Sequence, residues 1–248
     1  MTAVPPPAGP MPPTAPVRPR PVKGLGTAIA VLAVATWLAS IPLFTDGWTD
    51  YLRLSDHVSG QLSEDEYWDH YFGRVTSMLV FTALALPVSL AGGISWLVWV
   101  HRARTNAGLV SPHHRFRYSP GFSVGGLLVP FANLWWSRPI LEDICTGSSP
   151  YAPAHRAVRL VRTWWALLVT TTVVSITGSI AIPVPTLTYS PDGQLVSGGS
   201  EALDAFFAVA LLDTLLAVLG TASLALLVMV TRWVSGQQTA LLFAPRQA

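Results

Sequence analysis

The 248 residues include 51% hydrophobic and only 11% charged side chains, with a mean hydropathy of +0.46, whereas soluble domains carry about 25% charged residues. This composition excludes an ordinary soluble domain and predicts an integral membrane protein, because apolar stretches of about 20 residues can each cross about 30 Å of hydrocarbon. The single Cys145 excludes an intramolecular disulfide framework and a cysteine zinc cluster.

The first 23 residues are rich in proline and have no apolar periodicity. Because proline lacks a backbone donor and fixes φ, we predict a disordered tail that is partly polyproline II. It is either a solvated tail or a ligand for a proline-binding partner domain. Arginine outnumbers lysine fourteen to one, which favours the codon bias of a high-GC bacterial genome and hence a bacterial cell membrane.

Residues 24–233 are predicted to form one helical membrane domain, followed by a tail at 234–248. The expected spans are residues 24–44, 75–100, 164–183 and 203–231. An acidic loop separates the first two spans at 45–74, and Ser63 and Glu66 form a capping box that opens a short helix there. His57 and His70 in this loop indicate either a metal site or, since their spacing matches no ligand motif, a solvated acidic loop.

The second span contains Pro87, which predicts a kink. Small residues recur on one of its faces at Ala85, Ser89 and Gly93, and Gly92 adds another. This pattern is typical of closely packed membrane helices, so we expect a neighbouring helix against this face.

With four spans, one side of the membrane collects every lysine and arginine except Arg53 and Arg74. The positive-inside rule then predicts that both termini and the long basic loop between the second and third spans are cytoplasmic. The acidic loop faces outward.

That long loop contains an apolar stretch, residues 122–136, which would be about 22 Å long as a helix and is too short for a span. Pro130 and the pair Gly125–Gly126 weaken it further. We predict a re-entrant or interfacial helical hairpin at 121–145, in which Asn133 satisfies freed backbone groups and Pro139 begins a short surface helix.

Three runs here form a motif: His101-Arg-Ala-Arg-Thr-Asn106, Tyr118-Ser-Pro-Gly-Phe122 and Val129-Pro-Phe-Ala-Asn-Leu-Trp135 with Arg138-Pro139. Over residues 74–233 the chain resembles the domain of unknown function 4328 family, bacterial multi-span membrane proteins. It departs from the family at Phe122, where tryptophan is favoured, and at the inserted Trp136-Ser137. The resemblance implies a multi-span membrane protein with these motif residues: Arg102, Asn106, Ser119, Pro120, Gly121, Pro130, Asn133, Trp135, Arg138 and Pro139.

Asp213 lies ten residues into the fourth span, about 15 Å deep. Ionisable residues at that depth are costly and often functional. Two interpretations are open: a protonated carboxyl with a raised pKa that is hydrogen-bonded to a neighbouring Ser or Thr, such as those of the third span, or an ion or proton pathway.

Arg156, Arg159 and Arg162 share one helix face, which indicates either binding of anionic lipid headgroups or only the basic flank of a cytoplasmic span. His113–His114 are expected in a solvated loop, and Cys145 lacks a nearby His–acid pair for nucleophilic catalysis.

The predicted fold is therefore an all-α membrane protein with four transmembrane helices and a hairpin between the second and third. The favoured function is a non-enzymatic module that binds a partner or lipid. A small transporter or channel subunit using Asp213 is one alternative. A membrane enzyme on lipid-linked substrates, using Asp56, His57, Asp69 and His70, is another. The expected partners are the bilayer, anionic lipid and a protein partner or second copy. No catalytic residue, metal, cofactor or nucleic acid is expected.

Overall fold

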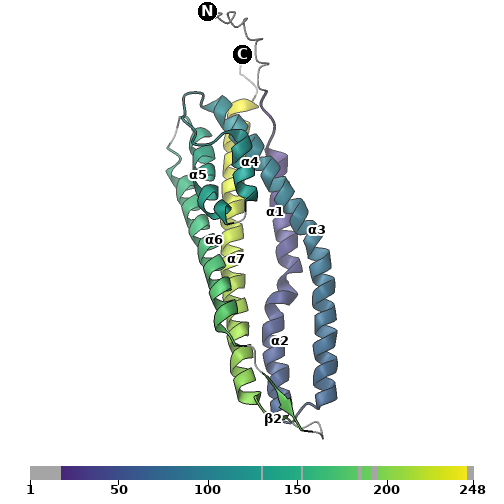
Figure 1. Cartoon of the computed structure of the whole chain (residues 1–248). Helices are drawn as coiled ribbons and strands as arrows, with labels where there is room; N and C mark the ends of the chain where they lie inside the picture. Colours follow the sequence, from purple (N-terminus) through teal and green to yellow (C-terminus); the bar gives the residue numbers. More distant parts are fainter. Residues whose placement is uncertain (1–17, 130, 152, 184–185, 191–194, 245–248) are drawn as a thin grey trace, which may run out of the picture.

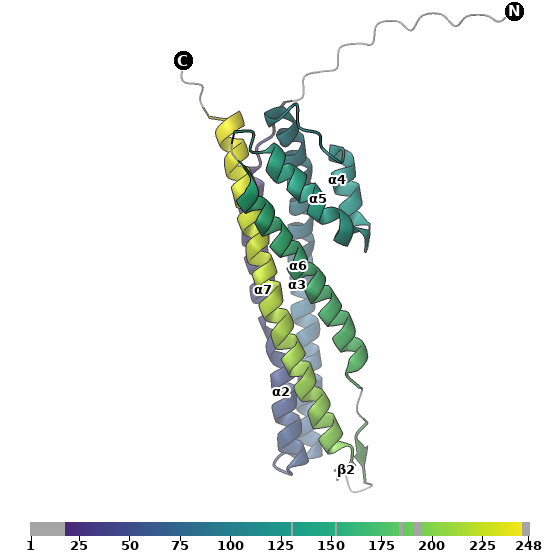
Figure 2. The same ribbon diagram turned by 90° about the vertical axis from the view of Figure 1, so that its left-hand side faces the viewer.

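The computed structural model describes residues 18–129, 131–151, 153–183, 186–190 and 195–244. They form an elongated bundle of long helices in which both ends of the chain emerge at the same end (Figures 1 and 2). We call this the terminal end, and the other the distal end. Most of the predicted proline-rich tail, residues 1–17, and the motif residue Pro130 lie outside the described residues.

The chain is almost entirely helical, as predicted. The elements are α1 (Lys23–Ala39), α2 (Ile41–Val58), α3 (Glu64–Val110), α4 (Pro120–Leu128), α5 (Ala132–Gly147), α6 (His155–Ala181), β1 (Thr188–Tyr189), β2 (Leu195–Ser197) and α7 (Gly199–Leu242). The two short strands pair antiparallel in the loop between the last two long helices.

Four helical segments are long and apolar enough to cross a membrane: α1 with α2 (36 residues), α3 (47), α6 (27) and α7 (44). No more than 11% of the apolar window of any of them is buried inside the protein. A surface this apolar needs a hydrocarbon environment, and the four-span prediction is confirmed. At about 1.5 Å per residue the helices measure roughly 40–70 Å, so they also extend beyond the hydrocarbon.

The acidic segment between the first two spans differs from the prediction. Only residues 59–63 form a loop, because α2 continues to Val58 and α3 begins at Glu64. The capping box is present: the Ser63 hydroxyl accepts from the Glu66 backbone, and the Glu66 carboxylate accepts from the Ser63 backbone. The helix that it opens is not short, since nothing stops it before Val110. The expected loop is therefore the end of two transmembrane helices.

Helix α3 runs through Pro87 and carries the small-residue face of the second span. The neighbouring helix is α1, whose Leu32 would lie at the ordinary contact distance of 3.7 Å from a Cβ added at Gly92. A Cβ added at Gly93 would meet none of the described atoms within 4 Å. The small residues therefore contact α1 at Gly92 and leave space beside Gly93.

In space the long helices run alternately away from and back to the terminal end, with α1, α2 and α3 on one side of Figure 1 and α6 and α7 on the other. Helices α4 and α5 form the connection between the second and third spans and lie at the terminal end, where α5 packs on α6 and α4 on α3. Two helices in contact with each other thus occupy the region of the expected hairpin. A re-entrant or interfacial position in the bilayer stays a prediction.

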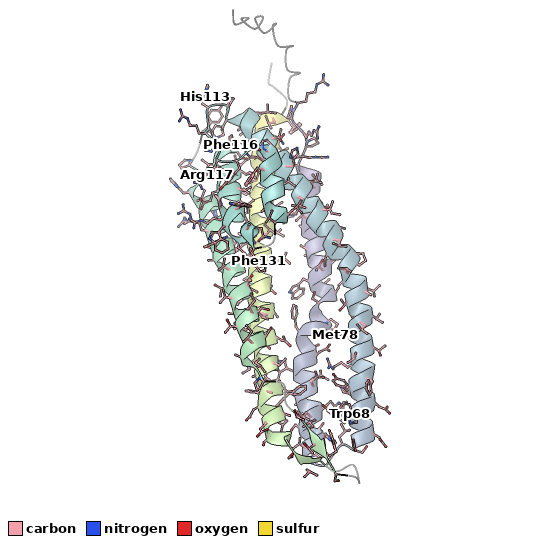
Figure 3. The ribbon with its side chains drawn as sticks, in the orientation of Figure 1. Trp68, Met78, His113, Phe116, Arg117 and Phe131 are labelled. Carbon is pink, nitrogen blue, oxygen red and sulfur yellow. The ribbon has the colours of Figure 1, made fainter. Side chains whose placement is uncertain are left out.

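The buried core is concentrated at the terminal end. Its largest members come from the ends of α3, α5, α6 and α7, such as Trp99, Ile140, Val161 and Val234. Residues 234–242, in the region predicted as a tail, continue α7, and Val234 and Gln238 are buried there. A second, small cluster around Leu54 lies at the distal end, close to Trp68, which is marked in Figure 3.

Candidate functional site

The family-type motif residues of α3 lie in the terminal-end core. Asn106 is fully buried and Arg104 is 8% exposed. The Asn106 amide exchanges two hydrogen bonds with the backbone of Arg20, accepting at 3.0 Å and donating at 2.7 Å. This contact fixes residues just before α1 against α3, so the last part of the predicted tail is ordered.

Asn106 also joins α3 to the end of α7. Its side chain donates to Gln238 Oε1 at 3.1 Å, and Gln238 Nε2 donates to the Ala103 carbonyl and to Ser148 Oγ, both at 2.8 Å. Gln238 is fully buried. Because buried amides are costly unless they are hydrogen-bonded, this network sets the register of α3, α7 and the end of α5.

Arg104 organises the segment between α3 and α4. Its guanidinium donates twice to the Tyr118 carbonyl, at 3.0 and 2.8 Å, and lies 3.5 Å from the centroid of the Phe116 ring. Phe116 in turn occupies the space beside Gly147, where a Cβ would lie 2.5 Å from the ring. Figure 3 shows Phe116 among the side chains of the terminal end. Gly147 is therefore required by this close approach.

Asp143, at 7% exposure, holds the same segment from the other side. It accepts from the backbone N–H of Arg117 at 2.8 Å, and the Arg117 side chain lies 3.6 Å from it. Asp143 and Arg104 together fix the geometry of residues 116–118.

Ser119, Pro120 and Gly121 begin α4. The Ser119 hydroxyl caps the helix by accepting from Phe122 N at 3.2 Å, and Pro120 occupies the first turn, where no donor is needed. The carbonyl of Pro120 lies 3.3 Å from the His101 ring. Arg102, half-buried on α3, reaches the Pro21 carbonyl at 3.4 Å. These motif residues therefore have structural roles in joining α4 and the N-terminal segment to α3.

The tip of the α4–α5 hairpin exposes apolar side chains. Phe131, which has a positive φ of 61°, is 75% exposed and Trp135 is 70% exposed. The Asn133 amide donates to the Leu127 carbonyl at 3.5 Å. Behind the tip, Trp165 of α6 donates to the Leu134 carbonyl. Figure 3 marks Phe131 at the end of the hairpin.

Pro139 lies inside α5 and does not begin a helix, contrary to the prediction, because α5 already starts at Ala132. The expected surface helix at 139–145 is also wrong. Ile140, Ile144 and Cys145 are buried against α6 and α3. Burial raises the pKa of the Cys145 thiol to about 12, with a smaller contribution from nearby Glu142.

Glu142 joins α5 to α6 through two arginines. Its Oε1 accepts from Arg138 Nε at 3.0 Å and from Arg162 Nε at 2.9 Å. Burial alone would raise the pKa of Glu142, but the two arginines outweigh it and lower the pKa below 4.5. Of the three arginines predicted to bind lipid, Arg162 is thus held in place by Glu142. Arg156 and Arg159 are exposed.

Asp213 lies in the distal half of the bundle beside α2. A Cβ at Gly47 would be 2.9 Å from its Oδ2, and it is close enough to Asp50 to interact electrostatically. Asp50 forms an ion pair with Arg74 at 2.7 Å. Asp213 and Asp50 line a cavity of about 370 Å³ between α2, α6 and α7. Among the described residues, the expected hydrogen bond from a Ser or Thr of α6 to Asp213 is not formed.

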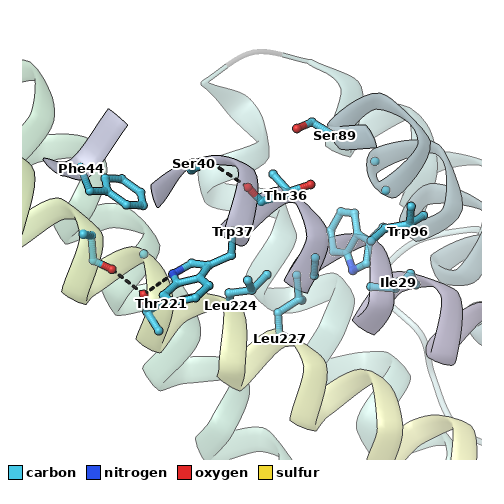
Figure 4. Close-up of a pocket in the computed structure, with 16 residues that line it drawn as sticks. Ile29, Thr36, Trp37, Ser40, Phe44, Ser89, Trp96, Thr221, Leu224 and Leu227 are labelled. Carbon is cyan, nitrogen blue, oxygen red and sulfur yellow. Dashed lines mark hydrogen bonds between the residues drawn. The ribbon is translucent and has the colours of Figure 1, made fainter. Parts of the chain in front are cut away.

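A larger cavity, of about 440 Å³, lies between α1, α3 and α7 (Figure 4). We call it the lateral cavity. Its lining is mostly apolar and includes small residues. Two of its polar side chains have local partners: Trp37 donates to Thr221 at 2.8 Å and Ser89 to the Ala85 carbonyl at 2.9 Å. The indole nitrogen of Trp96 is buried and has no hydrogen-bond partner in the described part of the chain. Sequence reasoning missed this cavity because it read the small residues as a packing face.

At the distal end, the ring of His57 is occupied by structural contacts. Nδ1 lies 3.1 Å from the Leu62 carbonyl, Nε2 lies 3.4 Å from the Tyr189 hydroxyl, and the ring stacks on Tyr67. Within the described ranges, no group of three or more His, Cys, Asp or Glu side chains is placed to hold a metal ion. These contacts favour a structural role for His57 over the catalytic one.

Gln238, Arg104 and Glu142 are central to this architecture but were not expected as site residues. The signal for Glu142 was present, since it and Asp143 are the acidic residues of an otherwise basic loop. Gln238 gave no such signal, because its partners are 90 to 135 positions away.

Four apolar helices joined in this way define a multi-pass membrane protein. The chain belongs to the family described as Domain of unknown function (DUF4328), which matches residues 70–236 and confirms the resemblance seen in the motif. The match begins in α3 and ends in α7, so α1 and α2 precede it. No curated protein and no solved structure matches the chain.

Proposed function

We propose that this protein is a non-enzymatic membrane module that binds lipid in the lateral cavity. The observation that carries the proposal is a cavity of about 440 Å³ between three membrane-spanning helices, lined by apolar side chains. Ser89 and Gly93 on its wall are exposed, so it opens to the outside of the bundle. Acyl chains are the apolar molecules that surround such an opening in a bilayer.

Trp96 indicates the depth of the cavity in the membrane. It lies six residues before Arg102, about 9 Å along the helix from the basic border. That depth is just below the headgroups, where the acyl chains begin, so the acyl chain of a lipid is the occupant that we propose.

The test is native mass spectrometry of the full chain extracted in mild detergent. Gly93→Leu fills the cavity and should lower the amount of retained lipid. Gly73→Leu is the matched control, because it makes the same change on α3 where nothing lies within 4 Å, and it should retain lipid like the wild type. Equal retention in the two variants would refute lipid binding in this cavity.

We propose further that the terminal end faces the cytoplasm. Its support is the distribution of charge, since both termini and the 111–154 segment share one end of the bundle with nearly all basic residues.

The orientation is tested with a variant that carries one accessible cysteine. Buried Cys145 is replaced by serine, and Tyr151, which is 90% exposed, is replaced by cysteine. An impermeant maleimide should then label inside-out vesicles and not intact cells. Labelling of intact cells would reverse the orientation.

A second candidate is a small transporter or channel subunit, which the cavity shared by Asp213 and Asp50 favours. In proteoliposomes, Asp213→Asn should abolish a proton or cation flux that the wild type supports. Asp204→Asn, an exposed carboxyl on the same helix, serves as the control. Flux that is equal in the wild type and Asp213→Asn would remove this candidate.

A further inference from the structure

The face formed by α5 and α6 holds two arginines side by side. Glu142, whose side chain is 10% exposed, binds the Nε atom of both Arg138 and Arg162 through the same carboxylate oxygen. The arginine side chains themselves are 40% and 58% exposed. A single buried carboxylate therefore positions two guanidinium groups at the surface.

This arrangement leaves a net positive charge and unused donors. Each guanidinium carries five N–H donors, and only the Nε donor is engaged by Glu142. In the part of the chain that the structure describes, the Nη groups of Arg138 and Arg162 make no hydrogen bond. Two adjacent planar donor groups with one excess charge match the oxygens of a phosphate group.

The surroundings indicate where the phosphate comes from. The Arg138 guanidinium lies 5.4 Å from the ring of Trp165, which sits at the start of the apolar part of α6, and tryptophan is enriched at the membrane interface. The exposed apolar tip of the hairpin, with Phe131 and Trp135, lies at the beginning of α5, the helix that carries Arg138. A phosphate bound at Arg138 and Arg162 would therefore have apolar protein surface beside it, as a lipid headgroup requires and a soluble anion does not.

We propose that Arg138 and Arg162, positioned by Glu142, bind the phosphate of an anionic lipid headgroup, with the acyl chains against the hairpin tip. This site rests on the lipid-binding function proposed above and specifies the class of lipid, but it uses a different face from the lateral cavity. It also divides the three arginines of the sequence prediction, because Arg162 belongs to the site while Arg156 and Arg159 lie outside it.

The experiment measures the binding of phosphatidylglycerol and phosphatidylcholine to the detergent-solubilised full chain by native mass spectrometry. The wild type should prefer phosphatidylglycerol. The double variant Arg138→Gln/Arg162→Gln should weaken its binding about tenfold or more. The control Arg156→Gln/Arg159→Gln removes the same charge at the same end of the protein and should change it much less. Equal weakening in the two double variants would overturn the site in favour of general basicity.

A charge-conserving pair covers the case in which the glutamine variant does not fold. Arg138→Lys/Arg162→Lys keeps the net charge but removes the planar donors, and it should also weaken phosphatidylglycerol binding. Unchanged binding in this variant would refute recognition by the paired guanidinium groups. Inorganic phosphate is titrated against the bound lipid as well. Displacement at concentrations similar to those of the lipid would assign the site to a soluble anion.

The two lipid proposals fail in different ways. If the wild type retains no lipid of either kind, both the lipid-binding function and this site are refuted. If the wild type retains lipid but the site variant and the control show the same preference for phosphatidylglycerol, only the headgroup site is refuted. Gly93→Leu should lower total retained lipid without removing that preference.

Discussion

Replacing Gln238 by leucine tests whether the buried amide network holds the terminal end together. The change removes two hydrogen bonds donated by Nε2 and one accepted by Oε1, each with a net value of about 1 kcal/mol. Leucine fits the same volume and recovers roughly 1 kcal/mol by burying more apolar surface. We therefore expect Gln238→Leu to lower the free energy of unfolding by about 2 kcal/mol.

Two partners of Gln238 keep other hydrogen bonds, which limits the loss. Asn106 keeps its bonds to Arg20, and Ser148 still donates to the Ile144 carbonyl at 2.7 Å. One N–H of the buried Asn106 amide loses its acceptor, so about 2 kcal/mol is the lower end of the expected loss.

The assay is equilibrium unfolding of the detergent-solubilised chain in mixed micelles of increasing sodium dodecyl sulfate, followed by circular dichroism. Gln237 provides a matched control, since it has the same side chain on the same helix but is not fully buried. Gln237→Leu should change the free energy of unfolding by less than about 0.5 kcal/mol. If the two leucine variants are equally stable, the network does not contribute to stability and the reasoning is wrong.

Three further predictions concern other parts of the bundle. Gly47→Ala should lower the free energy of unfolding by about 1–3 kcal/mol, because a Cβ there would lie 3.0 Å from Ala210 Cα. Gly73→Ala, in open space, should raise the free energy of unfolding by about 0.5–1 kcal/mol. If both variants lose stability in the same unfolding assay, the space beside each glycine does not decide the effect. Because the pKa of Glu142 is lower in the folded protein, its contribution is present above pH 4.5 and lost as the pH falls below it. The usual pKa of glutamate is about 4.5. Between about pH 5 and pH 3, the free energy of unfolding of the wild type should therefore fall more steeply than that of Glu142→Gln. Parallel pH profiles of the two proteins would exclude this role. Finally, buried Cys145, with its raised pKa, should react with a maleimide at pH 7 only after unfolding, and rapid labelling of the folded chain would show that the thiol is accessible.

The sequence was sufficient for features that depend on neighbouring residues. The four spans follow from hydropathy alone, and the capping box at Ser63 needs only the glutamate three positions later. Their extent could not be predicted in the same way. Residues 45–58 carry several aspartates, which suggested a loop, but Asp50 is compensated by Arg74 of the next helix. That compensation exists only once α2 and α3 lie side by side.

The candidate site shows the same division. The motif from Arg102 to Pro139 identified the region where α3, α4 and α5 meet, but not what its residues do. Asn106 and Gln238 are 132 positions apart, so no local pattern reveals their bond. The small residues at Ser89 and Gly93 have the spacing of a packing face, and whether a helix or a cavity lies beside them depends on the placement of α1 and α7.

Helix α3 has a mechanical consequence for the whole protein. It is a single helix of 47 residues, about 70 Å long, and it carries Tyr67 in the distal cluster and Asn106 in the terminal-end core. No loop in it can absorb a displacement, so an axial shift imposed on one side of the membrane is transmitted to the other. Bending is easiest at Pro87, which provides no N–H for the carbonyl one turn earlier. Helix α3 thus connects the two ends of the protein along its axis, and its easiest bend lies near its centre.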